Sequence, residues 1–122
     1  LILGAAGMVG RKLVERLAKD GTLGGRTIAK ATLHDVVKPE APAGAPFAVE
    51  AHESDFAAPG AAETLIAGRP DVIVHLAAIV SGEAEADFEK GYRINLDGTR
   101  QLFEAIRLAG GGYAPRVVFT SS

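Results

Sequence analysis

The fold of this chain is decided by its first ten residues, LILGAAGMVG (1–10). Three apolar residues lead straight into glycines at positions 4, 7 and 10, and from Arg11 onward the apolar residues recur at helical spacing. This order predicts a buried strand, a tight turn and a helix. The glycines would permit the turn, the close approach of a pyrophosphate to the backbone, and tight packing of the helix on the sheet.

The first turn of that helix is a candidate anion site. Its free N–H groups and its dipole would face a bound phosphate. The residues expected to hold the phosphate are Gly4, Gly7, Met8, Val9 and Gly10. A glycine-rich turn that binds nothing is the alternative, because glycines also recur in loops for other reasons.

Length and composition limit the possible functions. The chain has 122 residues, 48% of them hydrophobic, a formal net charge of −2 and no cysteine. This length suffices for one modest core and not for two domains. The near-neutral charge, without a run of Lys or Arg, argues against nucleic acid or a membrane surface as a partner and favours a small molecule. No apolar run approaches the ~20 residues of a membrane span, and the lack of cysteine fits a reducing compartment, so we expect a soluble, cytoplasmic protein.

The rest of the chain alternates strand and helix patterns. The first helix should end near Gly21, with glycine in the left-handed position that follows a helix. Strands are expected at 27–36, 47–51, 72–76 and 116–120, and helices at 59–68 and 85–109. The long helix has an apolar stripe at i, i+3/i+4 spacing, which Leu102 widens and which is made of Phe88, Tyr92, Leu96, Thr99, Phe103 and Ile106. Short connections predict an α/β fold, a doubly wound parallel sheet with right-handed crossovers.

Both ends of the sequence fall inside this pattern. It opens within a strand, without an initiating Met, and stops at Ser122 soon after the apolar run at 117–119. We therefore expect the N-terminal part of a longer protein, in which residues 1–122 form one incomplete domain.

In such a sheet ligands bind at the carboxyl ends of the strands, so the residues after each strand are candidates. Asp35 ends the second strand, ~20 to 25 residues beyond the glycines, where an acidic side chain meets the adenosine ribose hydroxyls. A carboxylate there repels a 2′-phosphate and favours NAD over NADP, although Lys38 weakens this preference. The alternative role of Asp35 is to cap a strand end.

Further candidates follow the other strands. Asp55 and Phe56 are placed to bind the exocyclic amine of an adenine and to cover its ring, although an Asp in a polar turn is often only solvated. The small residues Ala77 and Ala78 would let a nucleotide lie against the backbone. The hydroxyls of TSS (120–122) would lie at the catalytic edge.

The histidines give weaker signals. His34, His52 and His75 lack metal-ligand spacing, so no metal site is expected. His75 lies on a buried strand, which favours a core residue over a catalytic base.

Taken together, these motifs resemble a known family. They are GAAGMVG (4–10), Asp35, Asp55-Phe56, HLAA (75–78), YRINLDGT (92–99) and VVFTSS (117–122). Over the whole chain they are similar to extended short-chain dehydrogenases/reductases of the NAD-dependent epimerase/dehydratase type. The resemblance implies that residues 1–122 form a Rossmann domain that binds NAD.

The resemblance also implies a role for each matching residue. The cofactor residues would be Gly4, Gly7 and Gly10 at the pyrophosphate, Asp35 at the ribose, Asp55 and Phe56 at the adenine, and Leu76, Ala77 and Ala78 along the cofactor. Asn95 would match a structural Asn that supports the catalytic lysine through water, a role compatible with a satisfied buried amide. Ser122 would match the catalytic serine that holds the reacting hydroxyl, with Ser121 as its neighbour.

One part of the family pattern is missing. The catalytic Tyr-x-x-x-Lys pair does not occur, because Tyr92 is followed four residues on by Leu96, and Tyr113 by Val117. Since that pair normally lies beyond the serine, a longer natural chain accounts for the departure better than a loss of function.

Within the family, residues 77–100 are similar to members that oxidise the 2-hydroxyl of a four-carbon sugar acid. This implies an NAD-dependent oxidoreductase in which a tyrosine takes the hydroxyl proton while hydride leaves the same carbon, and Ser122 orients that hydroxyl. Ser81 and Gly82, at the mouth of the crevice, are candidates for contacting the substrate.

Two other functions stay open. A nucleotide-sugar epimerase or dehydratase with bound NAD is the alternative enzyme, and an NAD-sensing module without chemistry is the alternative from another class. The family's two-helix contact also implies a homodimer, formed through the helix at 85–109.

Overall fold

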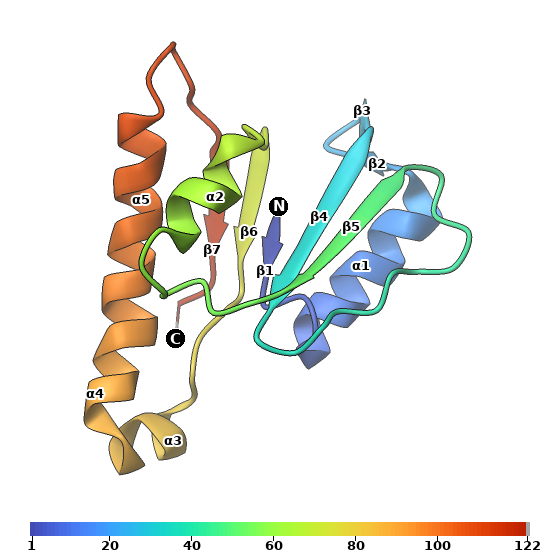
Figure 1. Cartoon of the computed structure of the whole chain (residues 1–122). Coiled ribbons are helices and arrows are strands. Elements are labelled where there is room, and N and C mark those ends of the chain that lie inside the picture. Colours follow the sequence, from blue (N-terminus) through green and yellow to red (C-terminus); the bar gives the residue numbers. More distant parts are fainter. Residues whose placement is uncertain (122) are drawn as a thin grey trace.

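A parallel five-stranded sheet forms the centre of the computed structural model, which describes residues 1–121 (Figure 1). The strand order is β5-β4-β1-β6-β7, and every neighbouring pair is parallel. These strands are β1 (Ile2–Leu3), β4 (Lys30–Asp35), β5 (Ala48–Glu53), β6 (Val72–His75) and β7 (Arg116–Phe119). The helices are α1 (Met8–Asp20), α2 (Ala61–Ala67), α3 (Ser81–Ala86), α4 (Phe88–Gly91), the π-helical η1 (Tyr92–Gly98) and α5 (Thr99–Leu108). The predicted doubly wound α/β fold is confirmed.

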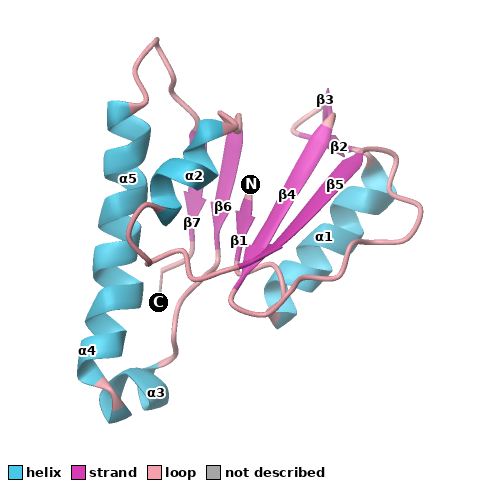
Figure 2. Ribbon diagram, viewed as in Figure 1, coloured by secondary structure: helices cyan, strands magenta, loops and turns pink. Residues whose placement is uncertain are grey.

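Helices cover both faces of the sheet (Figure 2). On one face α1 packs on a cluster that contains Ile2 and Leu33, and on the other α2 and α5 pack on a cluster that contains Leu3 and Ile73. Successive residues of a strand point to opposite faces, so Ile2 and Leu3 contribute to different cores. Both are buried, as expected for a central strand of a parallel sheet.

The first helix ends where the sequence predicts. Gly21 follows Asp20 in the left-handed conformation, with φ of 66°, and its N–H donates to the Leu17 carbonyl at 2.8 Å. This satisfies one of the free carbonyls of the last turn without a steric cost to a side chain.

The segment after α1 differs from the prediction. Instead of one strand at 27–36, a hairpin of β2 (Thr22–Leu23) and β3 (Arg26–Thr27) precedes β4. The turn consists of Gly24 and Gly25, both with positive φ, and such a turn matches the twist of an antiparallel pair. The predicted start of this strand is therefore wrong.

The prediction of one long helix at 85–109 is also wrong in its first half. The helical region begins at Ser81 and is broken at Asp87, whose φ of −133° and ψ of 87° are not helical. The Asp87 carboxylate accepts a hydrogen bond from the Lys90 N–H at 3.0 Å and so begins a new helix. A short polar side chain can cap a helix in this way at the expense of the helix that precedes it.

The predicted apolar stripe of this region faces the sheet only in part, because Leu102 is buried, Ile106 packs against the core and Thr99 contacts His75. The buried side chains are those of Ile94, Leu102 and Ala105. Four members of the stripe are 45–65% exposed, namely Phe88, Tyr92, Leu96 and Phe103. The prediction is therefore wrong for these four side chains, whose places toward the sheet are taken by Ile94 and Ala105.

Gly10→Ala should destabilise the fold. A Cβ at Gly10 would lie 2.2 Å from the Gly4 carbonyl oxygen and 2.7 Å from the Ala5 Cα, so backbone must move. Although alanine favours a helix interior, we expect overpacking to lower the free energy of unfolding by about 1–3 kcal/mol.

Urea denaturation of Gly10→Ala and Gly68→Ala measures this effect. Gly68 has φ of −74°, and a Cβ there meets nothing within 4 Å, so its replacement is a matched control. Equal stability of the two variants would contradict the packing role of Gly10.

Candidate functional site

The loops after β1 and β6 meet at the point where the strand order reverses. β1 pairs with β4 on one side and with β6 on the other, so the connections diverge from it. A Cβ at Gly4, whose φ is +83°, would lie 2.8 Å from the Ala77 nitrogen and from the Leu76 carbonyl carbon. The two loops are therefore in backbone contact, at the position where doubly wound sheets bind ligands.

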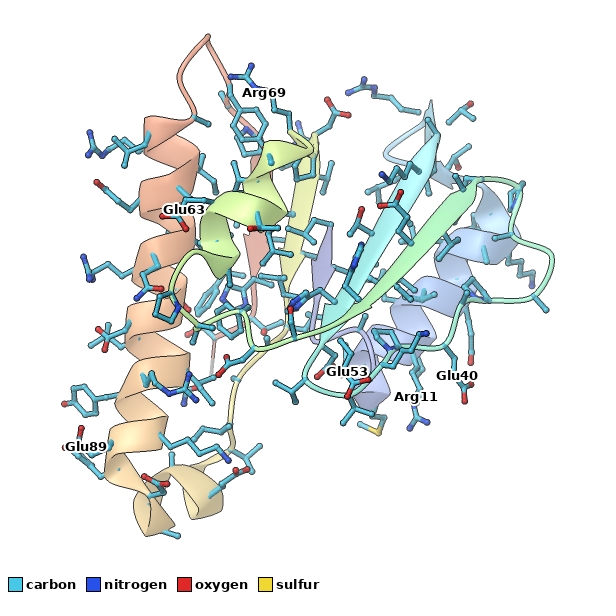
Figure 3. The ribbon with its side chains drawn as sticks, viewed as in Figure 1. Arg11, Glu40, Glu53, Glu63, Arg69 and Glu89 are labelled. Atoms are coloured by element: carbon cyan, nitrogen blue, oxygen red, sulfur yellow. The ribbon has the colours of Figure 1, made fainter. Side chains whose placement is uncertain are left out.

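The start of α1 is open to an anion. Gly7 occupies the N-cap position with extended backbone, and within the described chain it makes no capping hydrogen bond through a side chain. The first turn has no acidic residue, and Met8 and Val9 are more than half exposed. In Figure 3, Arg11 in this turn and Glu53 at the end of β5 lie at the same edge of the sheet. Uncapped N–H groups at a helix N-terminus favour a phosphate.

Asp35 lies beside this turn, as the sequence predicts. Its Oδ2 accepts a hydrogen bond from the Ala6 N–H at 2.9 Å, and its Oδ1 accepts one from the Val36 N–H at 2.7 Å. The half-buried carboxylate thus joins the end of β4 to the glycine turn. Each oxygen keeps a further lone pair that can accept from a ribose hydroxyl.

Asp55 is held by two donors in the loop after β5. Its Oδ1 accepts from the Ala57 N–H at 2.9 Å, and its Oδ2 accepts from Arg93 Nη1 at 2.6 Å. Partial burial raises the pKa of Asp55, but the hydrogen bonds from Arg93 and Ala57 outweigh it and leave the pKa below its usual value. The carboxylate therefore stays ionised near neutral pH. Sequence reasoning missed Arg93, because the two residues are 38 positions apart.

The ring of Phe56 is not where the sequence predicts. Its ring is 4% exposed and lies edge-on to the His75 ring, with centroids 5.2 Å apart. A Cβ at Gly98 would approach the Phe56 ring to 2.8 Å, so η1 packs directly on it. The prediction that this ring covers an adenine is wrong, because the ring belongs to the core.

A hydrogen-bonded chain connects β6 to η1. Thr99 Oγ1 lies 3.2 Å from the Asn95 carbonyl oxygen and forms a hydrogen bond with His75 Nε2 at 3.0 Å. The other ring nitrogen of His75, Nδ1, has no hydrogen-bond partner among the described residues. Burial lowers the pKa of His75, which keeps the ring neutral. The prediction of a core residue agrees with this environment.

Asn95 fixes the loop after β6. Its Oδ1 accepts from the Ile79 N–H at 2.9 Å, and its Nδ2 donates to the Ile79 carbonyl at 3.1 Å. Asn95 is exposed rather than buried, but both polar groups of its amide are satisfied. The amide thus anchors the loop that continues into Ser81 and Gly82, which are exposed in the first turn of α3.

The end of β7 is tied to the end of β6. The Thr120 N–H and Oγ1 both donate to the His75 carbonyl, at 3.2 and 3.1 Å. Ser121 is exposed beside them. Ser122, the predicted catalytic serine, lies outside the described residues.

Two further observations describe residues 1–121. No group of three or more His, Cys, Asp or Glu within them could hold a metal ion. None of the helices in this part of the chain has the length and apolar character needed to cross a membrane.

Asn95→Ala should release the loop after β6. We expect the Ile79 amide to exchange its hydrogen at least about tenfold faster, because its acceptor is removed. Hydrogen exchange followed by NMR measures this rate. The Leu76 amide, which donates to the Leu3 carbonyl in the sheet, should stay protected in the same sample. Unchanged exchange at Ile79 would contradict the role of the Asn95 side chain.

Two known proteins are similar to this chain in sequence. The chain is 42% identical to D-erythronate dehydrogenase of Cupriavidus necator and 36% identical to that of Haemophilus influenzae. Both matches include all of this chain but only 38% and 37% of the relatives' lengths.

A solved structure is still more similar. The crystal structure of a nucleoside-diphosphate-sugar epimerase from Agrobacterium tumefaciens is 70% identical, with a TM-score of 0.96. The match covers 99% of this chain and 36% of that one. A profile of the NAD dependent epimerase/dehydratase family matches residues 1–122. The chain therefore belongs to the NAD-dependent epimerase/dehydratase family.

Proposed function

We propose that the full-length protein is an NAD-dependent dehydrogenase that oxidises the 2-hydroxyl of a sugar acid such as D-erythronate to a 2-oxo group. The observation that carries this proposal is the uncapped start of α1 beside the Asp35 carboxylate, at a turn where Gly4 and Gly10 leave no room for a side chain. The two relatives named D-erythronate dehydrogenase support the substrate class.

The residues at this edge fit NAD. The N–H groups at the start of α1, with Gly7, Met8 and Val9, would bind the pyrophosphate, and the Asp35 carboxylate would accept from the ribose hydroxyls. The small residues at 77–78 would lie against the nucleotide. A 2′-phosphate would meet the negative charge of Asp35, so we expect NAD to bind better than NADP. When bound, NAD accepts hydride from the carbon that carries the substrate hydroxyl.

Other residues would position the substrate. We assign Ser122 to hold the reacting hydroxyl, and Ser81 and Gly82 to contact the sugar acid. Asn95 would set where those two residues lie, through its two hydrogen bonds to Ile79. The proton acceptor would be a tyrosine of the longer protein, since the chain has no Tyr-x-x-x-Lys sequence.

A nucleoside-diphosphate-sugar epimerase is the second candidate function. The name of the 70% identical structure favours it. An epimerase uses the same cofactor but regenerates it in each turnover, so it would release no net NADH.

Absorbance at the reduced-nicotinamide band distinguishes these functions. With full-length protein, NAD and D-erythronate, we expect steady NADH formation, at a lower rate when NADP replaces NAD. Activity on nucleotide sugars without net NADH would instead assign an epimerase. If the protein bound NAD but converted neither D-erythronate nor nucleotide sugars, the result would instead indicate an NAD-sensing module.

We further propose that two copies of the protein pair through the helical region that consists of α4, η1 and α5. Its stripe of Phe88, Tyr92, Leu96 and Phe103 stays 45–65% exposed, and the Phe88 and Tyr92 rings lie 4.6 Å apart. An exposed apolar stripe of this kind is typical of a contact surface, and a second copy would cover it symmetrically.

Light scattering of the full-length protein tests this pairing. The wild type should show twice the mass of one chain, whereas Phe103→Glu, which puts a charge in the stripe, should show the mass of one. Lys12→Glu, on α1 at the other face of the sheet, should remain paired. A wild type with the mass of one chain would contradict the proposal.

A further inference from the structure

One ion pair joins the edge of the sheet to the helical layer. Arg93 of η1 reaches the loop after β5, where its Nη1 lies 2.6 Å from Asp55 Oδ2. The other side-chain ion pairs of residues 1–121 are more local: they join residues two, three, four or seven positions apart in the chain, or residues of the neighbouring strands β4 and β5. The position of Arg93 therefore needs an explanation of its own.

The pair contributes little to stability. The Arg93 and Asp55 side chains are 46% and 34% exposed, and ion pairs with this much solvent contact stabilise a fold only weakly. Variants of Arg93 should therefore fold. The stronger effect of the pair is geometric, because a guanidinium holds a carboxylate in a defined orientation.

Two donors from different sides fix the Asp55 carboxylate. The Ala57 N–H takes one oxygen and Arg93 takes the other, so the group cannot rotate without losing a hydrogen bond. Ionised and held in this way, the group can only accept hydrogen bonds, and each oxygen retains a free lone pair. Such a group accepts from an exocyclic amine and repels an exocyclic carbonyl at the same position.

We infer that Arg93 is a positioning residue that sets the base preference of the cofactor site through Asp55. This inference rests on the proposed binding of NAD with its adenine amine at Asp55. Arg93 orients the carboxylate, and the oriented carboxylate selects a 6-amino purine over a 6-oxo purine. The recognition at this end of the site is therefore shared between the loop after β5 and the helical layer.

Nicotinamide hypoxanthine dinucleotide is the probe for this role. It differs from NAD by an oxo group in place of the adenine amine. By isothermal titration calorimetry, the full-length wild type should bind NAD about ten- to hundredfold more tightly than the hypoxanthine analogue. Arg93→Ala should bring this ratio of dissociation constants toward one, and Arg93→Lys, which keeps the charge but not the planar guanidinium, should retain only part of it.

Two further variants complete the test. The Asp55→Asn variant has an amide that can donate a hydrogen bond to a 6-oxo group. Its preference for NAD over the hypoxanthine analogue should therefore vanish or reverse. Arg100→Ala removes an exposed arginine of the adjacent helix α5 and should leave both dissociation constants unchanged.

The ratio distinguishes positioning from a general structural role. If Arg93→Ala weakened both dinucleotides by the same factor, Arg93 would be only structural and the inference would be wrong. A wild type that binds both equally would also overturn it, while the NAD site itself would stand. A wild type that binds neither dinucleotide would overturn the NAD site and this inference together.

Discussion

The close approach of α1 to the Gly4 carbonyl is the contact on which the rest of the structure depends. With no side chain at Gly10, the helix begins directly over the turn that ends β1. With no side chain at Gly4, the same turn touches the backbone of the loop after β6. A Cβ at either position would push these elements apart, and the start of α1 would no longer face the carboxyl edge of the strands.

Polar side chains hold the other loops to this edge. Asp35 binds the glycine turn through the Ala6 N–H, and Asn95 binds the loop after β6 through both backbone groups of Ile79. Arg93 binds Asp55 in the loop after β5. Asp35 belongs to β4, whereas Asn95 and Arg93 both belong to η1, so the edge is rigid only when the sheet and the helical layer are both assembled. This arrangement suits a site that must present fixed donors and acceptors to a dinucleotide.

Local patterns explain which features the sequence could predict. The glycine turn, the end of α1 at Gly21 and the position of Asp35 each depend on a few neighbouring residues, and all three appear where expected. The hairpin before β4 was missed because strands of two residues have no periodicity to detect. The break at Asp87 was missed because its carboxylate can cap a helix or lie on a helix surface, and the sequence does not distinguish these.

Long-range contacts explain the remaining differences. The burial of the Phe56 ring follows from Gly98 and His75, which pack on it from the helix and from β6. The link between Arg93 and Asp55 spans 38 residues and has no local signal. Features of this kind become visible only once the fold has brought the segments together.

An NMR titration of isotopically labelled protein with NAD shows directly whether the turn after β1 binds the cofactor. We expect the largest chemical-shift changes at the amides of residues 5–10 and 76–78, around the glycine turn. A cavity of about 610 Å³ between α1 and the loop at 40–44 is the competing location. Shifts confined to that loop, or no shifts at all, would contradict the claim that the turn after β1 holds the cofactor.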